Sequence, residues 1–290
     1  MKKTPKKLKS LSEDSIISFK EQKDEYSLEK FPYFGYYSVD IFDCPSFTMF
    51  TNNDCPRAID ILYHQNFEPM SIKIWSHLIM NSKTAIDIGA HVGIYSLVAA
   101  SLKKDIDIHA FEPNPDVFSR LLIHCNVNEF QNIRTFRNAF SNKNGITKLF
   151  WVNKYVNGWL SSGSTLIEGL PKEVINTSIV NVSGFDNFYK DYKIEEPFVI
   201  KIDIEGAEEL AIESMKETIK KKPDIIIETF SEKAANRISS ISKECGYSYF
   251  LIDEIKMKIH RLENLIACDP TKTNFNQLMT TRPEYLNNFL

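Results

Sequence analysis

A short apolar run that ends in an aspartate and two glycines constrains the fold more than any other stretch. The run covers residues 84–88, Asp87 lies near its end, and Gly89 and Gly93 precede a helical pattern that begins at Ile94. A strand that stops at a glycine-rich turn and feeds a helix is how a doubly wound α/β sheet opens its ligand site. The glycines allow a tight turn and a close approach to a ligand. The stretch therefore predicts an α/β fold with a ligand at this turn.

The spacing of the glycines and the position of Asp87 indicate which ligand this is. A dinucleotide fold uses G-x-G-x-x-G around a pyrophosphate, whereas this turn reads G-x-x-x-G and carries a carboxylate that repels phosphate. A fixed carboxylate suits a ligand with an ammonium and no phosphate, such as S-adenosylmethionine, whose sulfur is also cationic. The alternative is that Asp87 is a buried carboxylate that caps the next helix.

Composition describes an ordinary globular protein that works inside the cell. The 290 residues allow one large domain with an extension, and the net charge of −3 does not favour a general nucleic-acid binder. Five cysteines without a C-x-x-C pair predict reduced thiols in a cytoplasmic protein. No apolar run is long enough to span a bilayer, and the lysine-rich start lacks the apolar region of a secretory signal.

Four segments follow from these patterns. Residues 1–30 read as a flexible, basic and polar tail that either is solvated or contacts an anionic partner such as a membrane surface. Residues 31–80 form an aromatic-rich extension and a helix that starts at Pro69, preceded by Glu68 as a helix-start carboxylate or a second anion near the cofactor. Residues 81–268 form the cofactor-binding domain, and 269–290 a C-terminal tail.

The second and third strands bring further polar groups to the predicted site. The strand at 106–111 ends in Glu112, about 20 residues beyond the glycine turn, where an acid is placed to accept hydrogen bonds from ribose hydroxyls. The strand at 133–136 leads to Asn138, which either binds the adenine or is a turn asparagine. Adenosine occurs in several cofactors, so Glu112 alone does not distinguish them.

A later strand carries charges where an apolar run is expected. Central strands of parallel sheets are nearly all apolar, yet residues 198–202 include Lys201, and Asp203 follows on the same face with Glu205 just beyond. Buried charges are costly unless they are paired. The two interpretations are a structural lysine–carboxylate pair and a catalytic group at the carboxyl end of the strand.

The remaining elements complete the predicted sheet. A helix is expected over 207–220, and a strand at 224–227 ends in another acid, Glu228. The last strand is expected within 264–268, antiparallel to its neighbour. Acids that follow several strands on one edge indicate a site rather than a chance arrangement.

Taken in order, these stretches resemble the FkbM family of S-adenosylmethionine-dependent methyltransferases. The resemblance covers roughly residues 60–268 and rests on IDIGAHVGIYSL, FEPNP, NAFSN, IKIDIEGAE and PDIIIE, with an upstream FEP at 67–69. It implies a class I methyltransferase fold, Rossmann-like, with a seven-stranded sheet that is mostly parallel and has an antiparallel last strand. It also implies methyl transfer to a hydroxyl oxygen, often on a sugar, glycan or secondary metabolite.

The resemblance also implies roles for individual residues. The cofactor-binding set by position is Glu68, Asp87, Gly89, Ala90, His91, Gly93, Glu112 and Asn138. His91 replaces an asparagine that is more usual in the family, and we expect no loss of cofactor binding from it. The acids that border the acceptor are Asp203, Glu205 and Glu228, with Asp203 the first choice of general base and Lys201 its ion-pair partner.

Other chemistries remain as alternatives. Mg²⁺ on the carboxylates is a variant that we do not predict, because no histidine cluster accompanies the acids. An NAD-dependent oxidoreductase lacks support from the glycine spacing, and a nucleic-acid methyltransferase lacks the proline and aromatic residue expected after the fourth strand. A scaffold that kept the fold without activity is the third alternative. The sequence does not identify the acceptor or the oligomeric state.

Overall fold

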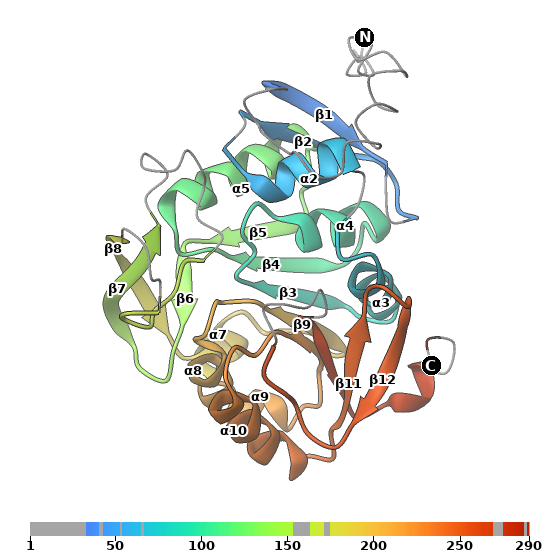
Figure 1. The fold of residues 1–290 in the computed structure, drawn as a ribbon, viewed down its shortest axis with the longest axis vertical. Coiled ribbons are helices and arrows are strands. Elements are labelled where there is room, and N and C mark those ends of the chain that lie inside the picture. Colours follow the sequence, from blue (N-terminus) through green and yellow to red (C-terminus); the bar gives the residue numbers. More distant parts are fainter. Residues whose placement is uncertain are drawn as a thin grey trace.

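An eight-stranded sheet with helices on both faces forms the body of the protein (Figure 1). The structure, a computed structural model, describes residues 33–40, 43–52, 54–64, 67–152, 163–170, 175–268, 275–286 and 289. The predicted tail at 1–30 lies outside these residues. From edge to edge, the strands are β12 (Lys258–Leu262), β11 (Ser248–Asp253), β13 (Gln277–Thr280), β10 (Asp224–Ile227), β9 (Phe198–Ile202), β3 (Thr84–Ile88), β4 (Asp107–Phe111) and β5 (Ile133–Phe136).

The direction of the strands explains where a ligand site can form. The five strands from β10 to β5 run parallel, whereas β13 lies antiparallel between β10 and β11. The strand order places β3 centrally, so that β4 and β5 lie on one side of it and β9 and β10 on the other. The chain therefore reverses its direction of winding at β3, and the carboxyl ends of the strands around it are where such sheets bind ligands.

Alternate residues of the strands fill two separate cores. On β3, Ala85 packs with one cluster and Ile86 with the other, and Val199 and Ile200 on β9 divide in the same way. This is the two-residue period of a strand that is buried on both faces. The helices of the first face are α3 (Pro69–Met80), α4 (Ile94–Leu102) and α5 (Pro115–Val127). Those of the second face are α7 (Phe185–Asp191), α8 (Glu208–Glu213), α9 (Lys216–Ile219) and α10 (Glu232–Lys243).

The aromatic-rich segment packs over the first face of the main sheet. It forms a hairpin of β1 (Gly35–Val39) and β2 (Phe47–Thr51), followed by α2 (Pro56–His64). The hairpin is fastened to α5, because the Phe50 N–H donates to His124 Nε2 at 3.0 Å and the Thr48 N–H donates to Asn128 Oδ1 at 2.6 Å. Tyr37 donates its hydroxyl proton to the Ala58 carbonyl and is buried, so this aromatic residue is a packing group.

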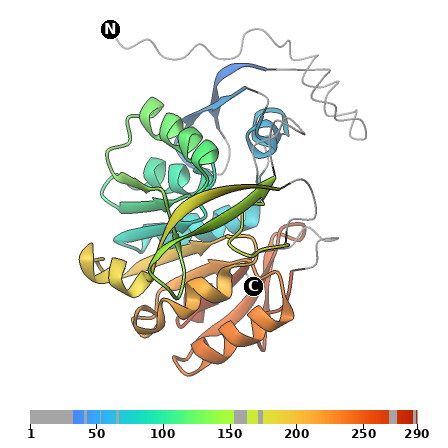
Figure 2. The same cartoon turned by 90° about the vertical axis from the view of Figure 1, so that its left-hand side faces the viewer.

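A second, smaller sheet lies beside the main one. It consists of β6 (Asn138–Phe140), β8 (Ile175–Ser183) and β7 (Gly145–Val152), in that order. Figure 2 shows the long β7–β8 pair in front of the main sheet on one side of the molecule. Because β6 follows β5 directly, this sheet continues from the third parallel strand and contributes to the wall of the site described below.

The structure corrects three details of the predicted fold. No strand forms at 264–268; the antiparallel strand is β13, within the stretch predicted as a tail, followed by a 3₁₀ turn at Pro283–Leu286. Leu265 is buried as a packing residue instead, which is why the apolar run looked like a strand. The described residues form eight strands in the main sheet rather than seven, since β12 adds an edge strand.

The third correction concerns the helix predicted over 207–220. It is interrupted, and α8 and α9 are separated at Ser214. The Ser214 carbonyl accepts the Asp186 N–H, and the Phe185 N–H donates to Ser214 Oγ at 3.1 Å, so α7 docks where the helix breaks. The Asp186 carboxylate in turn caps α9 through the Thr218 N–H. Within the described part of the chain, no helix is long and apolar enough to cross a membrane.

Candidate functional site

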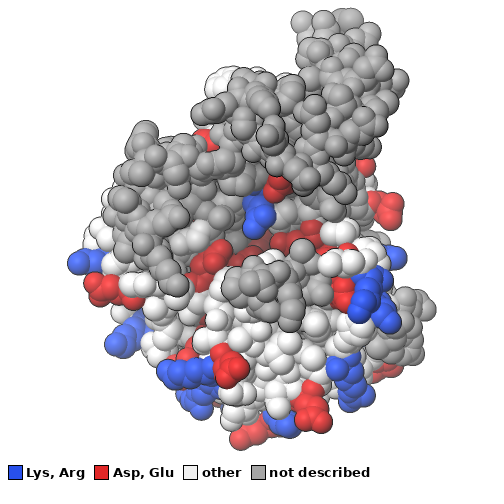
Figure 3. All heavy atoms as spheres, in the orientation of Figure 1, with Lys and Arg blue, Asp and Glu red and all other residues white. Residues whose placement is uncertain are grey.

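A pocket opens at the carboxyl ends of the parallel strands. Its walls come from the turns after β3, β4, β9 and β10, the start of α3, and the small sheet. Figure 3 shows Asp and Glu side chains along the hollow in the middle of this face. The charged residues that line it are Arg57, Glu68, Asp87, Glu112, Lys201, Asp203, Glu205 and Glu228.

Gly89 and Gly93 shape the turn after β3, for reasons of packing. Gly89 has φ +81°, and a Cβ there would lie 1.8 Å from the Asp203 carbonyl oxygen, so the turns after β3 and β9 touch at this point. Gly93 has φ +95°, and a Cβ there would meet Leu121 at 2.6 Å. Gly89 lines the pocket, whereas Gly93 lies behind it at the start of α4. The sequence predicted that these glycines let a ligand come close to the backbone. In the structure, they first let other parts of the chain come close.

Asp87 lines the pocket and also binds α4. Its Oδ2 accepts the Ser96 N–H at 3.1 Å and the Ser96 hydroxyl at 2.7 Å. Burial raises the pKa of Asp87 to about 6, although the bonds from Ser96 and the charge of Lys201 act in the opposite direction. One oxygen of Asp87 therefore caps α4, as the alternative interpretation predicted. Its role in cofactor binding stays a prediction.

Glu112 is held by backbone groups on both sides. Its Oε2 accepts the His91 N–H at 3.0 Å, and its Oε1 accepts the Asn114 N–H at 2.8 Å. Burial raises the pKa of Glu112 to about 7 against these two donors. Each oxygen keeps a second lone pair, so the carboxylate is oriented and still able to accept a bond from a ligand hydroxyl. His91 contributes its backbone N–H here, so this bond does not depend on the identity of its side chain.

Lys201 and Asp203 form the ion pair that the sequence predicted. Lys201 Nζ donates to Asp203 Oδ2 at 3.3 Å, and the lysine side chain is only 1% exposed. The ammonium also lies 5.2 Å from the centre of the Tyr95 ring. Burial alone would lower the pKa of Lys201, but the nearby carboxylates, Asp203 and then Glu228, outweigh it and raise the pKa.

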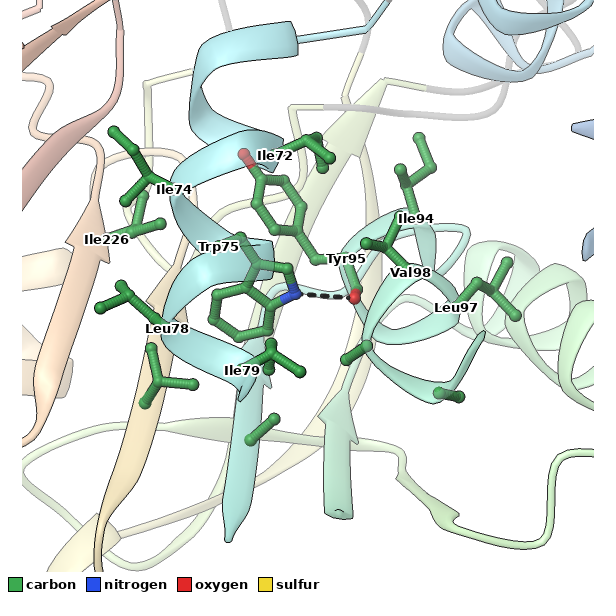
Figure 4. Packing of buried hydrophobic residues seen from close by; sticks show 14 of the residues in the cluster. Ile72, Ile74, Trp75, Leu78, Ile79, Ile94, Tyr95, Leu97, Val98 and Ile226 are labelled. Carbon is green, nitrogen blue, oxygen red and sulfur yellow. Dashed lines mark hydrogen bonds between the residues drawn. The ribbon is translucent and has the colours of Figure 1, made fainter. Parts of the chain in front are cut away.

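Tyr95 connects this pair to Glu68. The tyrosine hydroxyl donates to Glu68 Oε2 at 2.6 Å, and Asn276 Nδ2 donates to the same oxygen at 2.8 Å. Figure 4 shows Tyr95 packed against Trp75 of α3, whose indole N–H donates to the Tyr95 carbonyl at 3.0 Å. Glu68 is therefore fixed at the start of α3 by a residue of α4 and a residue next to β13.

The start of α3 is capped by a carboxylate from a distant turn. Glu68 is in the left-handed region with φ 41° and gives no side-chain cap. Glu254, between β11 and β12, accepts the Met70 N–H at 2.7 Å and the Ser71 N–H at 3.1 Å. This leaves the Glu68 carboxylate available to the pocket rather than to its own helix.

Two further acids complete the pocket beyond Asp203. Burial, reinforced by Asp203, raises the pKa of Glu205 to about 8 and that of Glu228 well above its usual value. Glu228 is 7% exposed, and no hydrogen bond or ion pair joins its carboxyl to another described residue. Glu205 has a left-handed backbone with φ 51°, which is uncommon for this residue type.

The structure brings nearly all of the predicted site residues together. Glu68, Asp87, Gly89, Ala90, His91, Glu112, Asn138, Lys201, Asp203, Glu205 and Glu228 line the pocket, and Gly93 does not. Asn138 lies on β6 and donates through Nδ2 to Ser183 Oγ at 3.0 Å, so its amide oxygen is oriented by the small sheet. Their roles remain predictions.

Sequence reasoning missed Tyr95, Asn276 and Glu208. Tyr95 reads as an ordinary apolar residue of α4, and Asn276 lies in the stretch predicted as a tail. Glu208 is fully buried, accepts the Gly206 N–H at 2.9 Å, and has a pKa raised to about 7 by burial. An acid at the start of a helix is usually explained by its favourable interaction with the helix dipole. The sequence therefore offered no reason to expect that Glu208 is buried.

The carboxylates of the pocket do not form a recognisable metal centre. Among the residues that the structure describes, no three His, Cys, Asp or Glu side chains lie in a group that could hold a metal ion.

The chain is similar in shape to several solved methyltransferases. They include precorrin-6y C5,15-methyltransferase of Geobacter metallireducens (13% identity, 73% of this chain and 87% of that one, TM-score 0.39). A SAM-dependent methyltransferase of Agrobacterium tumefaciens matches at 8% identity, over 88% and 72%, with TM-score 0.46. A SAM-dependent O-methyltransferase of Thermotoga maritima matches at 9%, over 81% and 73%, with TM-score 0.39. Likeness at this level indicates neither substrate nor mechanism.

No curated protein matches the sequence. The model of the FkbM methyltransferase domain matches residues 87–249, which is more than half of the chain. This match begins at Asp87 and includes the turns that carry Glu112, Asp203 and Glu228. It confirms the predicted enzyme class, a methyltransferase with the Rossmann-like class I fold and S-adenosylmethionine as donor. The chain belongs to the FkbM methyltransferase family.

Proposed function

We propose that this protein transfers a methyl group from S-adenosylmethionine to a hydroxyl of a sugar, glycan or secondary metabolite, with Asp203 as the general base. The observation that carries the proposal is the Lys201–Asp203 pair, 3.3 Å between Nζ and Oδ2, at the edge of a pocket in a methyltransferase fold. Burial of a lysine this deep costs free energy that an ion pair offsets only in part, and a functional role gives a reason to keep it.

The donor side of the pocket fits an adenosine with a methionine tail. Glu112 lies at the end of β4 with both oxygens oriented and free lone pairs, which suits two ribose hydroxyls. Asn138 and Phe140 line the wall beyond it, where we expect the adenine. Asp87 and the turn at Gly89 lie next to β9, where we expect the methionine ammonium.

The acceptor side contains the group that takes the proton. Lys201 occupies Asp203 Oδ2, and Asp203 is partly exposed to the pocket, so its second oxygen can meet an acceptor hydroxyl. When bound, S-adenosylmethionine supplies a methyl carbon on a sulfonium sulfur. The hydroxyl oxygen forms the new C–O bond as the C–S bond breaks, and the hydroxyl proton passes to Asp203. Positioning of the two reactants by the pocket supplies much of the remaining rate.

The charge of the pocket argues against two alternatives. The carboxylates that line it repel a nicotinamide dinucleotide, which carries a pyrophosphate, and also the backbone of a nucleic acid. A neutral or cationic small molecule is the acceptor that we propose. The cytoplasm is the location that we propose, since the five cysteines are free thiols. Peripheral contact of the lysine-rich N-terminus with a membrane stays a hypothesis.

Calorimetric titration with S-adenosylhomocysteine, NAD and NADP, with and without Mg²⁺, tests the donor. We expect binding of S-adenosylhomocysteine alone, and binding of a nicotinamide cofactor instead would contradict the proposal. Transfer of label from methyl-labelled S-adenosylmethionine to a panel of sugars and glycolipids then tests the reaction.

Asp203→Asn separates binding from chemistry. We expect the variant to bind S-adenosylhomocysteine as the wild type does and to lose about 100- to 10,000-fold in kcat, because the amide cannot accept the proton. Asp186→Asn is the matched control, since Asp186 caps α9 outside the pocket. Full turnover in Asp203→Asn would remove this residue from the role of base.

A further inference from the structure

The acids of the pocket fall into two groups at opposite ends of the site. Glu112 follows β4 and Glu228 follows β10, and β3 and β9 lie between these strands. Neighbouring strands lie about 4.8 Å apart, so the two carboxyls are separated by roughly 14 Å. If Glu112 binds the ribose, as the proposed function requires, Glu228 lies away from the nucleoside and on the acceptor side.

The acceptor side has more negative than positive groups. Asp203, Glu205 and Glu228 line the pocket there, against Lys201 and Arg57, and Glu68, which the sequence assigns to the cofactor, lies close enough to Glu228 to raise its pKa. Glu68 and Asp203 are engaged, the first by Tyr95 and Asn276 and the second by Lys201. Glu205 and Glu228 have no hydrogen-bond or ion-pair partner among the described residues.

The unpartnered carboxyl of Glu228 is the observation that points to a ligand. It is 93% buried and lines the pocket, no described side chain is hydrogen-bonded to it, and the Lys201 ammonium acts on it only through its charge. A buried carboxyl without a partner is costly, and natural proteins keep such groups mainly for function. Its neighbours favour a cation, because a positive charge stabilises the ionised form of the acids that line this side of the pocket, whereas an anion is repelled by them.

We infer that the acceptor carries an amine as well as a hydroxyl, as in an amino sugar, and that its ammonium binds Glu228 and Glu205 while the hydroxyl faces Asp203. This inference rests on the proposed function and adds the substrate class. An ammonium offers three hydrogen-bond donors and a positive charge, which two separate carboxyls can share. The methyl group still goes to the hydroxyl oxygen, and the ammonium keeps its proton and acts as a binding group.

Binding of an ammonium at this position should release protons from the carboxyls that hold it. Burial and then repulsion from Asp203 raise the pKa of Glu205 to about 8 and that of Glu228 well above its usual value, so Glu205 holds a proton near neutral pH when no ligand is bound. A bound ammonium favours the ionised carboxylates, and binding therefore releases protons. Calorimetry in buffers with different ionisation enthalpies measures that release.

The test uses the full-length protein saturated with S-adenosylhomocysteine. Glucosamine, N-acetylglucosamine, glucose and glucose 6-phosphate are titrated into it, since they differ mainly in charge. We expect glucosamine to bind at least about tenfold more tightly than the other three, with proton release. Glucosamine binding no tighter than glucose, including no binding by any of them, overturns the inference, as does tighter binding of the phosphate.

Variants locate the binding at the pocket. Glu228→Gln should reduce the preference for glucosamine over glucose by roughly 10- to 100-fold. Glu232→Gln makes the same change on an exposed residue four positions along the chain and should keep the preference. If Glu228→Gln instead weakens S-adenosylhomocysteine, or if Mg²⁺ alone binds in a Glu228-dependent manner, the carboxyl serves the donor or a metal and the inference is wrong.

The two proposals fail in distinguishable ways. Absence of S-adenosylhomocysteine binding in the first titration contradicts the proposed function. Intact S-adenosylhomocysteine binding without a preference for the amine contradicts the inference alone.

Discussion

At the residue scale, the charge balance of the pocket depends on Lys201. Its ammonium faces Asp203, lies near the Tyr95 ring, and has its pKa raised by the surrounding carboxylates. Without it, these acids would face one another with no cation on the central strand. A buried ion pair adds little stability by itself, but removal of one partner leaves the other charge uncompensated.

We therefore expect Lys201→Met to lower the free energy of unfolding by about 3 kcal/mol and to abolish methyl transfer. The double variant Lys201→Met/Glu228→Gln should recover part of the stability and none of the activity, because it removes one uncompensated acid but not the need to orient Asp203. Urea unfolding and label transfer measure the two effects.

Lys220→Met is the control for the loss of a lysine as such. Lys220 is exposed and bound to Glu217 at 2.6 Å on the surface, so we expect little change in stability. Equal losses in both lysine variants would mean that the buried pair has no special importance.

The residue scale is also where prediction from sequence was most informative about chemistry. A lysine inside an apolar strand and an acid two residues later are visible without a structure, because side chains alternate along a strand. The bond from Tyr95 to Glu68 was not visible, since it joins residues 27 positions apart through the packing of two helices. Nothing in the local pattern of α4 distinguishes this tyrosine from a core residue.

At the element scale, the turns after β3 and β9 act as one unit. The Gly89 backbone touches the Asp203 carbonyl, and the Asp203 N–H donates to the Ile88 carbonyl at 3.0 Å. The turn after β3 and the turn after β9, which we propose bind the donor and carry the base, are therefore placed against each other by direct contact. A change in one should disturb the other.

Gly89→Ala tests this coupling. We expect loss of S-adenosylhomocysteine binding and of turnover together, because the new Cβ would lie 1.8 Å from a backbone oxygen and must displace it. Gly169→Ala is the matched control: Gly169 has φ +79°, and a Cβ there would meet nothing within 4 Å. Both variants carry the left-handed strain of about 1–2 kcal/mol, and only the first carries the clash. Normal binding and turnover in a folded Gly89→Ala would show that the two turns are independent.

Elements with strong local signals were predicted well, and those that depend on distant contacts were not. The strands at 84–88, 133–136 and 224–227 agree with the structure. The break between α8 and α9 arises from α7, and the short β13 is a strand because it lies between β10 and β11. Neither cause can be read within a local window of sequence.

At the scale of the whole molecule, the buried acids of the site should make the free energy of unfolding depend on pH. Burial raises the pKa of Asp87 to about 6, of Glu112 and Glu208 to about 7, and of Glu205 to about 8. Each is above the value near 4 of an unfolded carboxyl, so the folded protein holds more protons than the unfolded chain in this range. Stability conferred by the neutral acids is complete below about pH 4 and is lost as pH rises through the raised values.

We therefore expect the free energy of unfolding to fall between about pH 4 and 8, at up to about 1.4 kcal/mol per pH unit for each of these acids whose raised pKa still lies above the pH. Burial lowers the pKa of His124 to about 4, so this residue makes stability rise with pH between about 4 and 6.5, but it offsets only one of the four acids in that range. Urea unfolding at a series of pH values measures the slope. Glu205→Gln should make it shallower near pH 8, whereas Glu232→Gln, exposed in both states, should not. A flat profile in the wild type would mean that water or ions reach these carboxyls in the folded protein. The carboxyls of Glu205 and Glu228 would then be solvated, and no ligand would be needed to explain why they lack partners.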